Sequence, residues 1–190
     1  RFIFALNAHP LPVRERELLR KKGEAHLTKY VETYIPTWNY NVLTEFNIRG
    51  IALAEDLKIT GKLDKIELSD STSDVAVVDY KTKKPQSRNW IEGKIGDSEG
   101  DYKRQLIFYK LLLDLYPEKK FNMTSGVIDF VEPNDRGMFK KEIFVIEESE
   151  VQELKATILK VASEIRNLSF WDGRCGKKEC SYCKLRDMMR

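Results

Sequence analysis

Cysteine, histidine and long hydrophobic runs are scarce in this chain of 190 residues. Its three cysteines all lie between Cys175 and Cys183. They cannot build the disulfide framework of a small secreted domain, so a reducing, cytoplasmic location is expected. No apolar run approaches the roughly 18 residues that a membrane span needs, and the chain does not open at Arg1 with a signal peptide. We therefore expect a soluble fragment of a larger protein, with no membrane partner.

A phosphate-binding loop of the GxxxxGK[ST] type is also missing, so this chain carries no nucleotide-driven motor. The charge balance excludes few functions, because the chain has 33 Lys and Arg residues against 30 Asp and Glu residues. So small a positive surplus does not indicate a nucleic-acid partner. The composition, 42% hydrophobic and 33% charged, is that of a globular protein. We expect one domain over residues 1–190, with a cysteine-containing tail at 172–190.

Hydrophobic spacing predicts helices around a sheet. Helical periodicity predicts helices at 18–34, 102–116 and 148–169. Short β-favouring segments predict strands at 42–50, 51–58, 59–68, 75–81, 125–132 and 138–146. The glycine-rich, charged stretch from 83 to 101 predicts a long mobile loop. The pattern is that of an α/β domain, with a central mixed sheet flanked by helices.

The first unusual feature is Asp79-Tyr80-Lys81 at the end of an apolar strand. Alternation along a strand places Asp79 and Lys81 on one face of the sheet. Asp64 lies in the preceding strand, and a hairpin between the two strands would bring both carboxylates close together. Two neighbouring carboxylates repel each other unless a cation lies between them. A structural salt bridge at a strand end is the alternative interpretation.

Carboxylate oxygens are ligands that Mg²⁺ and Mn²⁺ prefer. Such an ion can polarise a phosphodiester and activate a water molecule, while Lys81 orients that water or stabilises charge on the phosphate. Gln105 and Tyr109 are four residues apart, so they share one helix face and could contact a phosphate or Lys81. Taken alone, that pair is also typical of an ordinary amphipathic helix, and His26 of an ordinary core or surface histidine.

Four short motifs follow one another along the chain: Gly23-x-x-His26, Gly61-x-x-Asp64, Asp79-x-Lys81 and Gln105-x-x-x-Tyr109. In this order they resemble the successive motifs of the RecB-like branch of the PD-(D/E)xK nucleases. The resemblance implies a restriction-endonuclease-like core and a DNA exonuclease. In that branch the domain commonly belongs to helicase-nucleases of the UvrD, RecB or AddAB type, which work in DNA repair and recombination. The motor would lie in the same or a partner chain.

The resemblance also implies a role for each motif residue. His26, Asp64, Asp79 and the backbone carbonyl of Tyr80 would bind the metal. Lys81 would be the catalytic lysine. Gln105 and Tyr109 would line the site and contact DNA or position Lys81.

Basic residues are frequent between the last two motifs, where a DNA backbone needs positive charge. They are Lys83, Lys84, Arg88, Lys94, Lys103 and Arg104. Trp90 lies among them and could stack on a base of single-stranded DNA, or it could cover the core of a solvated loop. Base-reading spacing is missing, so we expect little sequence specificity. An inactive DNA-binding module is the alternative to an enzyme, although such a module would not need Asp64, Asp79 and Lys81.

The cysteines could supply thiolate ligands for Zn²⁺ or an iron–sulfur cluster. Some RecB-like nucleases hold a [4Fe–4S] cluster with one upstream and three C-terminal cysteines. This chain has no upstream cysteine, and Cys175-x4-Cys180-x2-Cys183 departs from the expected spacing. Unligated thiols of a degenerate site are therefore the leading interpretation, ahead of a cluster and of zinc.

Overall fold

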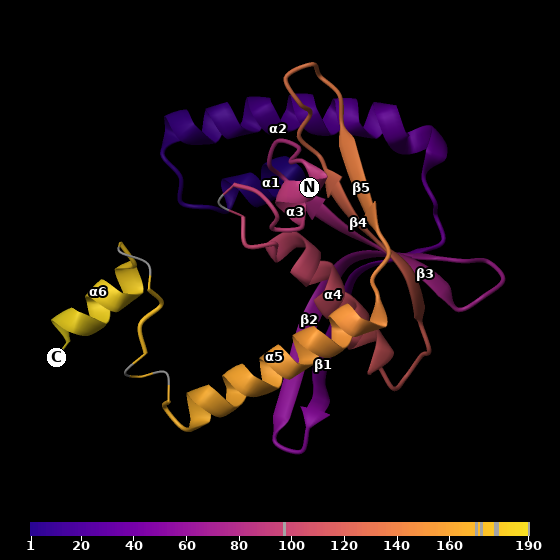
Figure 1. The fold of residues 1–190 in the computed structure, drawn as a ribbon. Coiled ribbons are helices and arrows are strands. Elements are labelled where there is room, and N and C mark those ends of the chain that lie inside the picture. The colour runs from indigo at the N-terminus through magenta and orange to yellow at the C-terminus, as the bar shows by residue number, and fades with distance from the viewer. Residues whose placement is uncertain (97, 170, 172, 177–178, 190) are drawn as a thin grey trace. The chain divides into compact units, whose positions relative to one another are not determined.

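The computed structural model describes residues 1–96, 98–169, 171, 173–176 and 179–189 (Figure 1). The chain divides into two compact units, Arg1–Val151 and Gln152–Arg190. The first unit contains the sheet and all four nuclease-like motifs, and the second contains the cysteines. No helix among the described residues is both long enough and apolar enough to cross a membrane.

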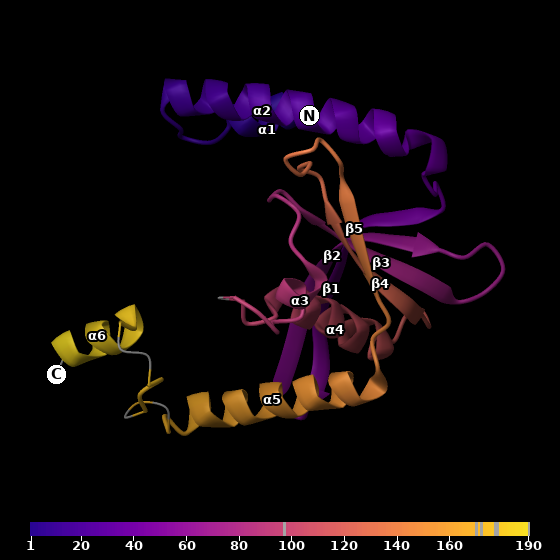
Figure 2. The ribbon, with the colours of Figure 1, turned by 45° about the horizontal axis from the view of Figure 1, so that its top comes forward.

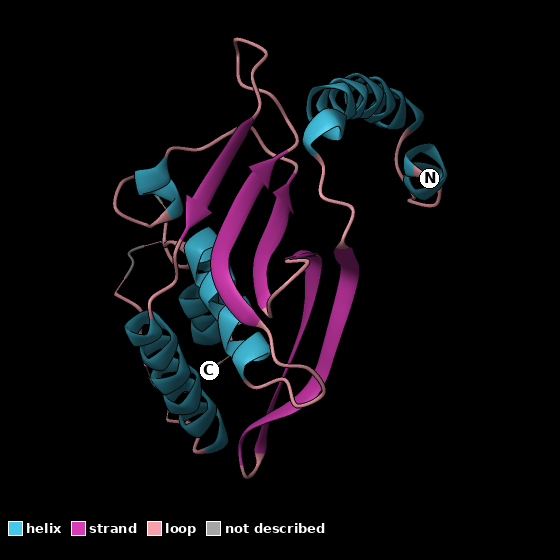
Figure 3. Ribbon diagram, turned by 90° about the vertical axis from the view of Figure 1, so that its right-hand side faces the viewer, coloured by secondary structure: helices cyan, strands magenta, loops and turns pink. Residues whose placement is uncertain are grey.

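A five-stranded mixed sheet in the order β1-β2-β3-β4-β5 forms the centre of the first unit (Figure 3). Its strands are β1 (Val42–Ala54), β2 (Leu57–Leu68), β3 (Asp74–Lys81), β4 (Asn122–Phe130) and β5 (Lys140–Phe144). β3 and β4 are parallel, and the other neighbouring pairs are antiparallel. The parallel pair requires a long crossover, which the segment between Lys81 and Asn122 supplies. The predicted α/β fold is confirmed.

The other regular elements of the described residues are helices. They are α1 (Phe2–Asn7), α2 (Val13–Tyr34), the 3-10 helix η1 (Ile35–Thr37), α3 (Arg88–Ile91), α4 (Asp101–Asp114), α5 (Glu148–Arg166) and α6 (Ser181–Met188). The prediction missed α1, the short α3 and α6. A side-chain cap starts α3, because Ser87 Oγ accepts a hydrogen bond from the backbone N–H of Trp90. The segment from 83 to 101 is therefore not a structureless loop throughout.

Gly50 does not end a strand, and the predicted break between 42–50 and 51–58 is wrong. β1 continues to Ala54, and the first of its two register shifts against β2 lies between Ile48 and Ile51. Gly50 has a φ of 66°, a conformation that favours glycine. A glycine within a strand pattern commonly marks such a bulge. The actual turn lies at residues 55–56, next to the pair Ala54 and Leu57.

α4 packs against one face of the sheet, where Figure 3 shows it crossing the strands. Leu106, Leu112 and Leu113 of α4 are at most 1% exposed. The helix comes close because Gly61 of β2 has no side chain. A Cβ atom there would lie 2.3 Å from Leu112 Cδ1. The glycine of the Gly61-x-x-Asp64 motif therefore admits the helix that carries Gln105 and Tyr109.

We expect Gly61→Ala to lower the free energy of unfolding by about 1–3 kcal/mol, because the new methyl group overpacks a buried contact. Chemical denaturation of the variant measures the loss. The matched control is a double-mutant cycle with Leu112→Ala. This substitution should lower the free energy of unfolding less in the Gly61→Ala variant than in the native chain. Additive effects of the two substitutions would contradict this explanation of Gly61.

α2 lies beside the hairpin that joins β4 and β5 (Figure 2). Lys29 Nζ donates a hydrogen bond to the carbonyl of Gly137, at 2.8 Å. Tyr30 is buried, and its hydroxyl donates to Asp129 Oδ2 of β4 at 2.5 Å. Lys141 of β5 pairs with the same carboxylate at 2.9 Å. A buried polar cluster therefore attaches α2 to the sheet.

Candidate active site

Asp64 and Asp79 face each other across neighbouring strands. Lys65 of β2 pairs with Val78 of β3, and the same register places Asp64 opposite Asp79. Opposite residues of an antiparallel pair point to the same face, as the hairpin prediction required. Asp79 is 2% exposed, so burial raises the pKa of its carboxyl group; Lys81 and Tyr109 oppose this shift, and Asp64 adds to it.

Four side chains form a closed ring of polar contacts. Tyr109 Oη donates to Asp79 Oδ1 at 2.9 Å, and Gln105 Nε2 donates to Tyr109 Oη at 2.6 Å. Lys81 Nζ donates to Gln105 Oε1 at 2.7 Å and lies 2.6 Å from Asp79 Oδ2. Since a lysine only donates, Gln105 must turn its oxygen toward Lys81 and its amide nitrogen toward Tyr109. The ring fixes Lys81 beside the carboxylates.

The donor set fits a hard divalent cation. Asp79 Oδ2 is buried and, apart from its ion pair with Lys81, accepts no well-directed hydrogen bond from the described residues. Asp64 Oδ2 accepts a hydrogen bond from the backbone N–H of Tyr80 at 2.9 Å. The N–H and C=O groups of a strand residue point to the same side of the strand. The Tyr80 carbonyl therefore points, like its N–H group, to the β2 side of β3, beyond the last residue pair of the two strands. Three oxygen donors can thus converge, as Mg²⁺ and Mn²⁺ prefer.

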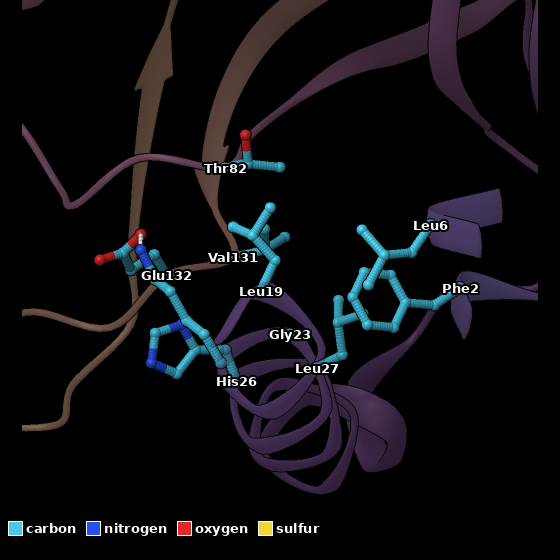
Figure 4. Close-up of a pocket in the computed structure, with 10 residues that line it drawn as sticks. Phe2, Leu6, Leu19, Gly23, His26, Leu27, Thr82, Val131 and Glu132 are labelled. Carbon is cyan, nitrogen blue, oxygen red and sulfur yellow. Dashed lines mark ion pairs between the residues drawn. The ribbon is translucent and has the colours of Figure 1, made fainter. Parts of the chain in front are cut away.

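His26 lies elsewhere within the same unit. It lines a cavity of about 330 Å³ between α1, α2 and the ends of β3 and β4 (Figure 4). Lys22 and Glu132, which form an ion pair at 2.7 Å, line the same cavity. Thr82, the residue after Lys81, also lines it. His26 is therefore near the end of β3, but not among the residues that contact Asp64 or Asp79 in the described part of the chain.

The basic residues between the last two motifs are mostly paired within the protein. Lys84 pairs with Asp135 at 2.5 Å, Arg88 with Glu142 at 3.2 Å and Arg104 with Asp101 at 2.6 Å. Lys94 pairs with Glu92, and Lys103 with Glu150. Lys83 is exposed and has no ion-pair partner among the described residues. The pairs Lys84–Asp135 and Arg104–Asp101 are exposed on both sides, and exposed pairs are weak, so a DNA phosphate could replace these two carboxylates.

Tyr102 is a site residue that the sequence did not reveal. Lys81 Nζ lies 4.4 Å from the centroid of its ring, within the range of a cation–π contact. The ring of Trp90 meets Tyr102 edge to face, with the centroids 5.3 Å apart. Tyr102 is the second residue of α4 and lies about one turn before Gln105, so both can contact Lys81. The i, i+3 spacing was the available signal, but many helices contain such a pair.

The second unit brings the three cysteines together. Their sulfur atoms all lie within 4.8 Å of one another, and Cys175 Sγ and Cys183 Sγ are 3.7 Å apart. Hydrogen bonds from the backbone N–H of Cys183 and from the Cys175 side chain lower the pKa of the Cys180 thiol to about 7. This arrangement could bind a metal ion. Among the described residues, no fourth His, Cys, Asp or Glu side chain joins the group.

Comparison with known protein families agrees with the fold. The model of the PD-(D/E)XK nuclease superfamily matches residues 5–188. No curated protein matches the chain. Among solved structures, the protein SSO0001 is similar at 20% identity and a TM-score of 0.45, over 85% of this chain and 65% of that one. A protein named "Putative exonuclease" from Eubacterium rectale is similar at 15% identity and a TM-score of 0.47, over 87% and 64%.

The five-stranded mixed sheet flanked by helices is consistent with the core of this superfamily, and the chain belongs to the PD-(D/E)XK nuclease superfamily. Proteins of this superfamily are nucleases that typically use divalent metals. The chain spans slightly less than two thirds of the length of the two structures named above.

Proposed function

We propose that this chain is a Mg²⁺- or Mn²⁺-dependent deoxyribonuclease of the RecB-like branch, acting as an exonuclease on single-stranded DNA. The observation that carries the proposal is the ring Asp79–Lys81–Gln105–Tyr109 beside Asp64. The order of the motifs supports the RecB-like branch. On the same basis, we propose a helicase motor in the same or a partner chain and a role in DNA repair or recombination.

Asp64, Asp79 and the Tyr80 carbonyl would hold the cation. His26 would join them as a further ligand if α2 moved toward the start of the loop that follows β3. The cation would polarise the scissile phosphate and lower the pKa of a water molecule. Lys81 would then stabilise negative charge on the phosphate or orient the water. If Asp79 Oδ2 bound the cation, Lys81 would lose its contact with that oxygen, and Gln105 and Tyr102 would keep Lys81 in place. Tyr109 would hold the other carboxylate oxygen, Asp79 Oδ1.

Binding of the DNA strand would use residues around this centre. Lys83 is exposed and free to approach a phosphate, whereas Lys84, Arg88 and Arg104 would exchange their present carboxylate partners for phosphates. Trp90 lies next to Tyr102 and would stack on a base. All these contacts are to backbone or ring faces, so they support cleavage with little sequence preference.

The cysteine group is a second candidate metal site. Three converging sulfurs and the lowered pKa of Cys180 favour a thiophilic ion. A [4Fe–4S] cluster would need a fourth ligand in addition to Cys175, Cys180 and Cys183. The proposed cleavage does not depend on this group.

The test is release of nucleotides from labelled single- and double-stranded DNA, and from RNA, with Mg²⁺, Mn²⁺ or EDTA. We expect metal-dependent cleavage of single-stranded DNA and none in EDTA. Asp79→Asn, purified in parallel, reports any contaminating nuclease. Binding of DNA by folded protein without cleavage under either metal would contradict the proposal and favour an inactive DNA-binding module.

Tyr102 offers a graded test of how Lys81 is positioned. We expect Tyr102→Leu to lower kcat about tenfold with little change in KM, because a cation–π contact contributes roughly 0.5–2 kcal/mol. Tyr102→Phe keeps the ring and should retain most of the activity. Steady-state kinetics of the two variants provide the comparison. Equal losses in both variants would show that the hydroxyl group, rather than the ring face, matters.

A further inference from the structure

The three cysteines of the second unit are close enough to share one metal ion. They are free thiols, and all three sulfur atoms lie within 4.8 Å of one another. Cys175 Sγ and Cys183 Sγ are 3.7 Å apart, much farther than the roughly 2.05 Å of a disulfide bond. A tetrahedral ion with Zn–S bonds of about 2.3 Å holds its sulfur ligands about 3.8 Å apart. The spacing of this pair is therefore that of two ligands on one ion.

The same spacing does not fit an iron–sulfur cluster. In a [4Fe–4S] cluster each cysteine binds a different iron atom, so the cluster core separates the thiolates more widely than a single ion does. Such a cluster also takes four cysteine ligands, whereas Cys175, Cys180 and Cys183 are the only cysteines of this chain. The residues present therefore do not fit the cluster that the resemblance to RecB-like nucleases suggested.

The start of α6 presents two of the sulfurs in a form that suits a metal. Cys180 directly precedes this helix, and Cys183 lies in its first turn. The backbone N–H groups of Tyr182 and Cys183 interact with the Cys180 sulfur and favour its thiolate form, which is the form that binds metals. The Cys180-x-x-Cys183 segment thus has the short ligand spacing that zinc sites use.

Polar contacts hold the segment that leads to Cys175 against the same helix. The Arg186 guanidinium of α6 donates hydrogen bonds to the backbone carbonyls of Trp171 and Gly173. Both carbonyls lie just before Cys175 in the chain. These contacts therefore place the third sulfur beside the turn that carries the other two.

A metal ion would supply stability that apolar packing does not give the second unit. None of the described residues of Gln152–Arg190 is buried. Small units without a hydrophobic core commonly depend on a bound metal for their stability. Three converging sulfurs near the end of this unit are a suitable ligand set for such an ion.

We propose that Cys175, Cys180 and Cys183 bind a single Zn²⁺ ion, with one tetrahedral position for a ligand from outside the trio. Thiolates are soft ligands, so they select zinc over Mg²⁺ and Mn²⁺. The ion would fasten the residues around Cys175 to α6. This structural site is independent of the proposed cleavage, because Asp64 and Asp79 belong to the other unit.

Co²⁺ is the probe for this site in the full chain, reduced and freed of metal. We expect the visible bands of a tetrahedral Co²⁺ ion together with sulfur-to-cobalt charge-transfer bands, saturating at one Co²⁺ per chain and abolished by Zn²⁺. Asp79→Asn removes a proposed ligand of the nuclease centre and should leave these bands unchanged. Absence of sulfur-to-cobalt bands in the native chain would overturn the proposal, as would purification of the chain with bound iron and inorganic sulfide.

Substitution of one cysteine tests the ligand set. Cys183→Ser should weaken Co²⁺ binding at least about a hundredfold, since loss of an outer contact alone typically costs roughly 10–100-fold. Glu179→Gln is the matched control. Glu179 is an exposed carboxylate next to Cys180 that pairs with Lys184 and is not part of the trio, so its loss should change the affinity by less than about twofold. Native affinity in Cys183→Ser would overturn the proposal.

Digestion with trypsin reports on the tail itself. Zn²⁺ should slow cleavage after Arg174 and Lys184 at least about tenfold in the native chain and have no such effect in Cys183→Ser, because a metal that orders a segment protects it. Cleavage of the native chain at the same rate with and without Zn²⁺ would contradict the structural role. Neither result bears on the nuclease proposal, which is tested by release of nucleotides.

Discussion

Asp79→Asn should reduce metal-dependent cleavage at least about a thousandfold, because the substitution removes a charged oxygen donor from the centre of the proposed site. The same variant should lose the thermal stabilisation that Mg²⁺ or Mn²⁺ gives the native chain, since a ligand that binds only the folded state stabilises it. Cleavage assays and thermal unfolding with and without metal measure the two effects. The control is Glu55→Gln, an exposed carboxylate in the turn between β1 and β2.

The stability of the metal-free protein provides a further check on Asp79. Burial raises its pKa above the ordinary value of 3.8, so the folded state binds its proton more tightly than the unfolded state does. Its contribution to stability is therefore fully present below about pH 4 and is lost as the pH rises through the folded pKa. In EDTA at neutral pH, Asp79→Asn should be at least as stable as the native chain. A clear loss of stability would show that the carboxylate is a structural group.

Lys81→Met should also lower cleavage by a factor of about 100 to 1,000, as expected for loss of a group that stabilises charge in the transition state. Metal binding should survive, because the substitution removes a positive charge next to the proposed cation. The combination of lost cleavage and retained metal stabilisation distinguishes Lys81 from Asp79. Both are measured by the assays used for Asp79→Asn.

Lys58→Met is the matched control for Lys81→Met. Lys58 is an exposed lysine of β2 and is not among the residues proposed to bind the metal or DNA, so its loss should change kcat by less than about twofold. If Lys81→Met also abolished metal stabilisation, Lys81 would be needed to arrange the carboxylates, and its role would be structural rather than catalytic.

The centre of the site could be predicted because local periodicity determines it. Alternation placed Asp79 and Lys81 on one face, the antiparallel register brought Asp64 opposite Asp79, and the four-residue spacing put Gln105 and Tyr109 on one helix face. The contacts of these residues in the structure agree with the geometry that the sequence indicated.

The remaining features depend on tertiary packing. A glycine at position 50 is compatible both with a bulge inside one strand and with a break between two strands. Only the observed pairing of β1 with β2 distinguishes these two possibilities. The cation–π contact between Tyr102 and Lys81 joins two distant segments, and the partners of Lys84 and Arg88 come from the β4–β5 region. The position of His26 depends on how α2 meets the sheet. Sequence periodicity carries no information about such contacts.

Tyr80 connects the two faces of the sheet. Its backbone N–H holds Asp64, while its ring meets Tyr30 of α2 edge to face, with the centroids 6.4 Å apart. Tyr30 is in turn fixed by Asp129, which lies beside Tyr80 in the parallel register. Movement of α2 would therefore reach a carboxylate on the opposite face through a single residue. A partner that pulled or pressed on this helix could adjust the spacing of the metal ligands without touching them.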